Sequence, residues 1–278
     1  MTWRMTVLVA AGALALVGAA PQARAVTTPI TTCGQTVSTN AVLTTDLDCI
    51  AHGIVVDTAG VTIDLKGYTI SGDRGTDHYG VYVLGVSGVT IKNGVIRNFG
   101  YGIKSIGVAN QLAVANVLVS GNAWFGVSVL GNGVSIKSST ANGNGTIGFL
   151  VNGNGASISS SVALGNQGDG ISVFGDSATV KSSTASGNDE RGIDIDGAAA
   201  SVKSSSAGGN GLDGIFVSGD GALPKGNRAE GNGYLDGNAD NAGRGITVQD
   251  FAIASPPTGL NTARGNDDAG ECFPGNLC

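Results

Sequence analysis

Apolar and polar residues alternate along short stretches of this chain, and the stretches recur every 22 residues. Six Gly-Asn pairs mark the period: Gly121-Asn122, Gly143-Asn144, Gly165-Asn166, Gly187-Asn188, Gly209-Asn210 and Gly231-Asn232. Alternation at period two predicts strands that turn one side inward. A fixed period near twenty residues predicts a stacked repeat, so the fold is readable from the pattern alone.

Alignment of the units by this step places like residues in three columns. The columns are Val127, Phe149, Ile171, Ile193 and Ile215; then Val129, Val151, Val173, Ile195 and Val217; and, from a second strand, Val114, Ile136, Ile158, Val180 and Val202. A unit of this length cannot hold a helix as well as these strands, so strand must stack on strand. We therefore predict an all-β parallel β-helix with 22-residue coils.

The Gly-Asn pairs are expected at the corners of the coils. Turns that need positive φ favour Gly and, less strongly, Asn. Stacked Asn side chains can also hydrogen-bond one another along the stack, so we expect an Asn ladder.

The two ends of the chain do not follow the 22-residue repeat. Residues 1–25 resemble a signal peptide, with Arg4, an apolar run and Ala23-Arg24-Ala25 as a cleavage site. We expect an N-terminal cap at 26–53, coils at 54–245 with an insertion near 233–243, and a closing segment at 246–278. A mature chain without a membrane span, secreted or periplasmic, follows from this interpretation.

Four cysteines permit three pairings. We favour the local pairs Cys33–Cys49 and Cys272–Cys278, because the stack would hold the two ends of the chain apart. The end segments would then be disulfide-bonded. A zinc site is the alternative, but the spacings lack a short C-x-x-C clamp.

Composition and charge limit the fold classes and the kinds of binding partner that fit this chain. Glycine contributes 47 of 278 residues, charged residues only 13%, and the formal charge is -6. This composition disfavours helices and excludes collagen, and the acidic balance argues against a nucleic-acid partner. It argues less firmly against an anionic polysaccharide. The oligomeric state is left open.

Several segments carry a resemblance to a known family. They are Cys33-Gly34-Gln35-Thr36, Thr45-Asp46-Leu47-Asp48-Cys49, Val61 to Ile70, Val89 to Gly94, and the Gly-Asn coils. In these the chain resembles the secreted right-handed parallel β-helix proteins of the pectate-lyase-like superfamily. The resemblance implies a right-handed, single-stranded β-helix. Because members include pectate lyases, polygalacturonases, alginate lyases and epimerases, it also implies a polysaccharide as partner.

One coil concentrates acidic residues: Asp189, Glu190, Asp194 and Asp196, with Arg191 among them. Asp194 and Asp196 lie two residues apart on one strand, so both are expected to point outward about 7 Å apart. That spacing suits an acid and a base flanking a water in an inverting glycosidase. The alternative is a solvated polar surface in which Asp169, Arg191 and Asp213 stack as a salt-bridge column.

Two further sets of residues could carry chemistry. The sequence Asp77-His78-Tyr79 could supply an acid/base pair, and His52 is the other histidine. Asp236, Asn238 and Asp240 follow a D-x-N-x-D spacing that could present oxygen ligands to Ca²⁺, although the rest of an EF-hand loop is absent. Calcium is thus the one cofactor we consider.

Outward apolar side chains predict a surface for sugars. Tyr82, Trp124, Phe174 and Phe216 are the candidates for stacking on sugar rings. We therefore expect a secreted β-helix protein that binds, and in one version modifies, a polysaccharide. The alternatives are a polysaccharide lyase, epimerase or glycoside hydrolase acting at Asp194 and Asp196, and a non-catalytic structural or adhesive surface protein.

Overall fold

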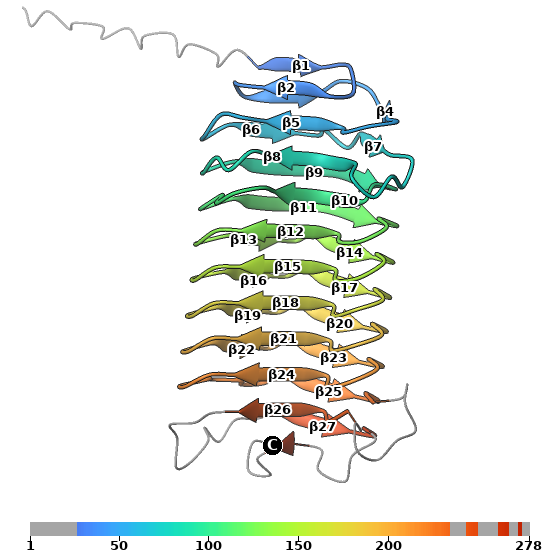
Figure 1. The fold of residues 1–278 in the computed structure, drawn as a ribbon. Coiled ribbons are helices and arrows are strands. Elements are labelled where there is room, and N and C mark those ends of the chain that lie inside the picture. The colour runs from blue at the N-terminus through green and yellow to red at the C-terminus, as the bar shows by residue number, and fades with distance from the viewer. Residues whose placement is uncertain (1–26, 234–242, 250–260, 267–271, 274–278) are drawn as a thin grey trace, which may run out of the picture.

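The computed structural model describes residues 27–233, 243–249, 261–266 and 272–273. Within these ranges the chain winds into a rod of stacked coils, running from the blue N-terminal rungs to the orange C-terminal rungs in Figure 1. Every strand pairing is parallel, and each coil hydrogen-bonds to the coils on either side. The predicted parallel β-helix is confirmed.

Each regular coil contributes one strand to each of three faces. The first face is an eleven-stranded sheet among the described residues. Its strands are β2 (Gln35–Val37), β5 (Ile54–Val56), β8 (Tyr79–Val83), β10 (Tyr101–Ser105), β12 (Val127–Leu130), β15 (Phe149–Asn152), β18 (Ile171–Phe174), β21 (Ile193–Asp196), β24 (Ile215–Ser218), β26 (Ile246–Gln249) and β28 (Cys272–Phe273).

The other two faces belong to one seventeen-stranded sheet that bends around a corner. The second face contains β1 (Thr28–Ile30), β3 (Ala41–Leu43), β6 (Thr62–Asp64), β13 (Ser135–Lys137), β16 (Ser157–Ser159), β19 (Thr179–Lys181) and β22 (Ser201–Lys203). The third face contains β4 (Leu47–Asp48), β7 (Thr69–Ser71), β14 (Thr140–Asn142), β17 (Val162–Leu164), β20 (Thr184–Ser186), β23 (Ser206–Gly208), β25 (Arg228–Glu230) and β27 (Thr262–Arg264). Two long strands, β9 (Thr90–Arg97) and β11 (Ala113–Ser120), run through both faces.

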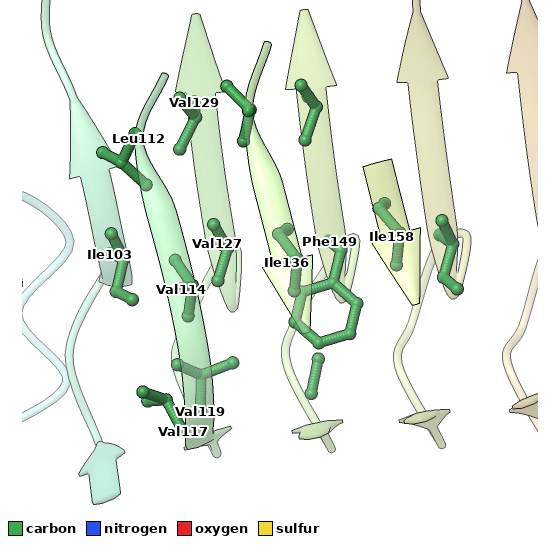
Figure 2. Packing of buried hydrophobic residues seen from close by; sticks show 14 of the residues in the cluster. Ile103, Leu112, Val114, Val117, Val119, Val127, Val129, Ile136, Phe149 and Ile158 are labelled. Atoms are coloured by element: carbon green, nitrogen blue, oxygen red, sulfur yellow. The ribbon is translucent and has the colours of Figure 1, made fainter. Parts of the chain in front are cut away.

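The core lies inside the coils and is built of like residues stacked on like. Val127 pairs with Phe149 and Phe149 with Ile171 in register, and all three are fully buried. Val114 and Ile136 of the second face stack in the same way. Figure 2 shows Val127 and Phe149 of the first face meeting Val114 and Ile136 of the second face. The three predicted columns are therefore confirmed as inward positions.

The third face was not expected as a separate strand. Its inward column is mostly alanine: Val119, Ala141, Ala163, Ala185, Ala207 and Ala229, each buried. Alanine between small polar residues gives little apolar alternation, so the sequence indicated two strands per coil where the structure has three.

The corner between the third and first faces holds the Asn ladder. Asn188 Nδ2 donates to Asn210 Oδ1 at 2.9 Å, and Asn166 Nδ2 donates to Asn188 Oδ1 at 2.9 Å. Gly187, which precedes Asn188, has φ +62. The asparagines of these pairs do not have positive φ. Their role is therefore to form the hydrogen bonds of the ladder, while the glycines provide the backbone conformation of the turn. A second ladder, of Ser139, Ser161, Ser183, Ser205 and then Asn227, lines the corner between the second and third faces.

The ends add three observations. Strands β1 to β4 lie in the segment expected as a cap, yet they pair as ordinary rungs. Cys33 and Cys49 form the expected disulfide, whereas Cys278 lies outside the described residues, as does the expected signal peptide. No helix among the described residues has the length and apolarity needed to cross a membrane.

The last described coil is longer than 22 residues, and its extra residues fall in two places. Asn210 and Asn232 keep the 22-residue step, but Arg244 follows Asp213 by 31 residues, so nine extra residues fall between Gly233 and Gly243. Asn266 follows Asn232 by 34, which places three more residues further along the chain.

Candidate functional site

One column of residues stands where each coil enters the first face, immediately before a glycine. We call it the entry column: His52, Tyr79, Tyr101, Phe125, Ile147, Asp169, Arg191, Asp213 and Arg244. The amide of the following glycine donates to the carbonyl of the next entry residue, as Gly170 does to Arg191 at 2.9 Å. A Cβ on Gly170 would lie 2.7 Å from the oxygen of Gly192, so this position excludes a side chain and keeps the entry residues in register.

The N-terminal end of the entry column is a stack of rings. His52 lies parallel to Tyr79 at 4.9 Å between centroids, Tyr79 meets Tyr101 edge-on at 5.4 Å, and Tyr101 stacks on Phe125 at 5.3 Å. Tyr82 of β8 packs against both Tyr79 and His52. These five half-buried residues form what we call the aromatic ladder. Offset and edge-on packing at these distances is favourable, so the rings support one another.

Polar groups border the aromatic ladder. His78 Nδ1 lies 2.7 Å from Asp73 Oδ1, so Asp73 is its partner in place of the expected Asp77. That hydrogen bond lowers the pKa of Asp73. Burial, and then the nearby His78, lower the pKa of His52. Lys104 Nζ lies 4.8 Å from the centre of the Tyr101 ring, and burial lowers its pKa.

The C-terminal end of the entry column is charged. Asp169, Arg191 and Asp213 occupy successive coils, and Asp194 of β21 joins them. Arg191 Nη1 donates to Asp194 Oδ2 at 3.1 Å, and the Arg191 amide donates to Asp169 Oδ1 at 2.9 Å. We call Asp169, Asp194 and Asp213, gathered around Arg191, the carboxylate cluster.

Burial dominates the electrostatics of the carboxylate cluster. Asp169 and Asp194 are only 7% and 8% exposed. Burial, and then the charge of Asp194, raise the pKa of Asp169 to about 7. Burial also raises the pKa values of Asp194 and Asp213, partly offset at Asp194 by Arg191 and at Asp213 by the amide of Arg244. Asp169 is therefore a carboxyl group that can hold a proton near neutral pH.

The expected catalytic residues are separated by this arrangement. Asp194 is buried against Arg191, whereas Asp196 is exposed and accepts a hydrogen bond from Ser218 Oγ at 2.8 Å. Asp189 and Glu190 lie exposed in the turn before β21. Ser172 and Phe216 stand in register with Asp194 on the adjacent strands. The further carboxylates, Asp169 and Asp213, approach Asp194 from the entry column. The expected stacking of Asp169, Arg191 and Asp213 is present, but the ion pair of Arg191 is with Asp194.

The expected sugar-stacking residues fall in different places. Tyr82 belongs to the aromatic ladder, and Trp124 is 43% exposed in the turn beside Phe125. Phe174 pairs in register with Asp196 and is exposed, whereas Phe216 pairs with Asp194 and lies under the guanidinium of Arg191. The four residues therefore do not form one line. The expected calcium ligands Asp236, Asn238 and Asp240 lie outside the described residues, and the described ones contain no cluster of His, Cys, Asp and Glu suited to a metal.

The aromatic ladder was missed because its spacing is irregular. Its entry residues follow one another by 27, 22 and 24 residues, so they fall out of a strict 22-residue alignment. A local signal was nonetheless available, namely an aromatic residue before Gly and a β-branched residue in Tyr79-Gly80-Val81, Tyr101-Gly102-Ile103 and Phe125-Gly126-Val127.

Comparisons with solved structures return proteins to which this chain is similar at low sequence identity. The A-module of the mannuronan C-5 epimerase AlgE4 from Azotobacter vinelandii is 16% identical over 88% of this chain and 79% of its own, with a TM-score of 0.49. Pectate lyase Pel9A is 14% identical over 83% and 69%, with a TM-score of 0.49. The Agl-KA catalytic domain is 10% identical over 84% and 59%, with a TM-score of 0.44. At these levels the likeness concerns the fold alone.

No curated protein sequence matches the chain. A family model described as "Right handed beta helix region" matches residues 52–206, which is more than half of the chain. Those residues include the aromatic ladder and, of the carboxylate cluster, Asp169 and Asp194 but not Asp213. They also carry most of the stacked columns from which the fold was predicted. The chain therefore belongs to the right-handed β-helix family.

Proposed function

We propose that this protein binds a polysaccharide along the outward side of the first face, with the aromatic ladder as its principal contact. The carrying observation is the unbroken stack from His52 to Phe125, whose rings are half-buried and so remain partly open to solvent. Aromatic side chains offer a large apolar area with polar groups at the edge, which suits the apolar face and the hydroxyls of a sugar ring. Successive coils repeat that contact along a line, as a linear polymer requires.

Rigidity supports the same proposal. Each ladder ring is held by its neighbours and by a backbone fixed in the stack, so little conformational freedom is lost on binding. Lys104, which lies over Tyr101 and donates to Ser128 Oγ at 3.0 Å, adds a cation at the edge of the ladder. The disulfide Cys33–Cys49, beside the expected signal peptide, supports export to an oxidising compartment where such polymers occur.

The test is binding of neutral polysaccharides in high salt, where ionic contacts are screened. We expect Tyr82→Ala and Tyr101→Ala each to weaken binding roughly tenfold, as loss of an aromatic anchor does at other interfaces. Tyr68→Ala is the matched control, because Tyr68 is a partly exposed tyrosine away from the ladder. Binding that survives both ladder substitutions in a folded protein would reject this site.

A second candidate function rests on the carboxylate cluster. A carboxyl group with a pKa of about 7, near other carboxylates on the same face, has the character of a general acid. In this version Asp169 would protonate a glycosidic oxygen and Asp194 would serve as the second carboxylate. Assays of uronate and neutral polymers for new reducing ends or unsaturated products test it. Activity should vanish in Asp169→Asn and Asp194→Asn and persist in Asp196→Asn. Binding remains the favoured function because the ladder is open to solvent while Asp169 and Asp194 are buried.

A further inference from the structure

Five of the seven lysines of the chain lie in one column on the outward side of the second face. We call it the lysine stripe: Lys92, Lys137, Lys181, Lys203 and Lys225, interrupted by Ala115 and Ser159. Lys181, Lys203 and Lys225 occupy three successive coils in register. Neighbouring strands are separated by about 4.8 Å, so these three ammonium groups leave the backbone at that interval.

The lysine stripe is unbalanced by acidic side chains over most of its length. At its N-terminal end Lys92 Nζ lies 3.7 Å from Asp64 Oδ2, beside a surface hollow of about 460 Å³ that Lys66 also lines. The other four lysines are exposed, and none of them forms an ion pair within the described part of the chain. Like charges placed directly opposite on adjacent strands destabilise a sheet. The fold therefore carries a repulsive row in a protein whose net charge is -6.

Hydroxyl groups flank the lysine stripe on both sides. Two residues earlier on the same strands stand Ser135, Ser157 and Thr179, which are open to solvent at least in part, and Ser201, which is buried. Directly after the strands stand the exposed residues Ser138, Ser160, Ser182 and Ser204. The serines after the strands all have positive φ and form the tight corner between the second and third faces. The surface is thus a straight row of cations in a field of small hydrogen-bonding groups.

We propose that the lysine stripe binds an extended anionic polysaccharide, whose regularly spaced carboxylate or sulfate groups pair with successive lysines while sugar hydroxyls bond the flanking serines and threonines. Charge complementarity selects a polyanion, and the straight stack selects an extended chain. Single-stranded nucleic acid is disfavoured because its binding sites combine cations with aromatic stacking, and no aromatic side chain occupies these outward positions between residues 113 and 204.

The lysine stripe and the aromatic ladder lie on different faces, so the two proposals can fail separately. The probes are polygalacturonate for carboxylate and dextran sulfate for sulfate, with neutral dextran as the uncharged comparison. The triple variant Lys181→Gln, Lys203→Gln, Lys225→Gln should weaken binding to at least one polyanion roughly tenfold and make it less dependent on salt. Its thermal stability should hold or rise, because the repulsion is relieved.

The matched control removes three positive charges from the third face: Arg97→Gln, Arg228→Gln, Arg264→Gln. It should bind the polyanions as the unaltered protein does. Equal weakening in the control would show that only net charge matters, and unchanged binding in the lysine variant would show that the stripe is not the site. Tighter binding to single-stranded DNA of equal length than to either polysaccharide would also overturn the proposal.

Discussion

The guanidinium of Arg191 lies 4.0 Å from the centre of the Phe216 ring, one coil further along the first face. The same guanidinium donates to Asp194, so one cation spans a ring and a buried carboxylate. This arrangement explains how three acidic side chains share a small region of the stack. It also makes Arg191 the residue on which the carboxylate cluster depends.

Replacing Arg191 by Gln should destabilise the protein in a pH-dependent way. At pH 8 the cluster is ionised and loses its cation, so we expect the free energy of unfolding to fall by about 2 kcal/mol or more. At pH 5 the loss should be smaller, because Asp169, with a pKa of about 7, is then protonated. Urea unfolding at both pH values measures this. Arg228→Gln, at an exposed ion pair with Glu230, should cost less than about 1 kcal/mol. Equal losses at the two pH values would contradict the assignment.

Asp169 should make the protein less stable as pH rises. Its pKa is about 7 in the folded chain and 3.8 as the ordinary value. Between these values the unfolded chain releases a proton that the folded chain keeps, so stability falls with rising pH and levels off above about pH 7. Asp169→Asn should remove this decline and raise stability at pH 8 by roughly 1 to 4 kcal/mol. Thermal melts from pH 4 to pH 8 provide the measurement. The exposed Asp189→Asn is the control, and a decline that persists in Asp169→Asn would assign the effect to other groups.

Asparagines that hydrogen-bond between coils should contribute more to stability at buried corners, as in the Asn ladder, than at exposed corners. Asn188 is fully buried, and its side chain bonds both neighbouring rungs. Asn188→Ala should lower the free energy of unfolding by roughly 2 to 3 kcal/mol, because buried backbone and amide groups lose their partners. Asn154 accepts from the amide of Asp176 at an exposed corner, where water can replace it. Asn154→Ala should therefore have the smaller effect in chemical denaturation, and the reverse order would be inconsistent with this account.

Reducing the disulfide Cys33–Cys49 should loosen the N-terminal coils first. The two cysteines are 16 residues apart, and a loop of that size contributes about 3 kcal/mol in the chain-entropy model. Stability in a stacked repeat passes between nearest neighbours, so the loss should remain local at first. Hydrogen exchange should be measured with and without reductant. We expect the reductant to accelerate exchange more in β2 and β5 than in β18 and β21. Uniform acceleration along the rod would instead indicate a single cooperative unit.

Much of the fold was predictable because the repeat is visible in single residues. The columns through Val127, Val129 and Val114 followed from period two within a strand and period 22 between coils. The Asn ladder followed from the Gly-Asn pairs. The alanine column through Ala163 was not predicted, since small residues between hydroxyls carry little hydrophobic signal.

The candidate site was less predictable, for a geometric reason. The 22-residue spacing predicts which outward side chains on adjacent strands lie side by side, so Asp194 and Phe216 could be aligned from the sequence. An entry residue stands at a corner of the coil, and the direction of its side chain depends on the backbone conformation at that corner. Asp169 and Arg191 approach Asp194 from that corner. The early coils also differ in length, which hid the meeting of His52, Tyr79 and Tyr101.

The sequence alone thus determined that the chain stacks into coils, which residues fill the interior on the first and second faces, and where the Gly-Asn corner falls, because these follow from a repeated pattern of burial. It also contained the 22-residue spacing of Lys181 and Lys203. The tertiary structure decided which side chains meet on the outside, since contacts between coils depend on the corners and on coil lengths that a strict period does not fix.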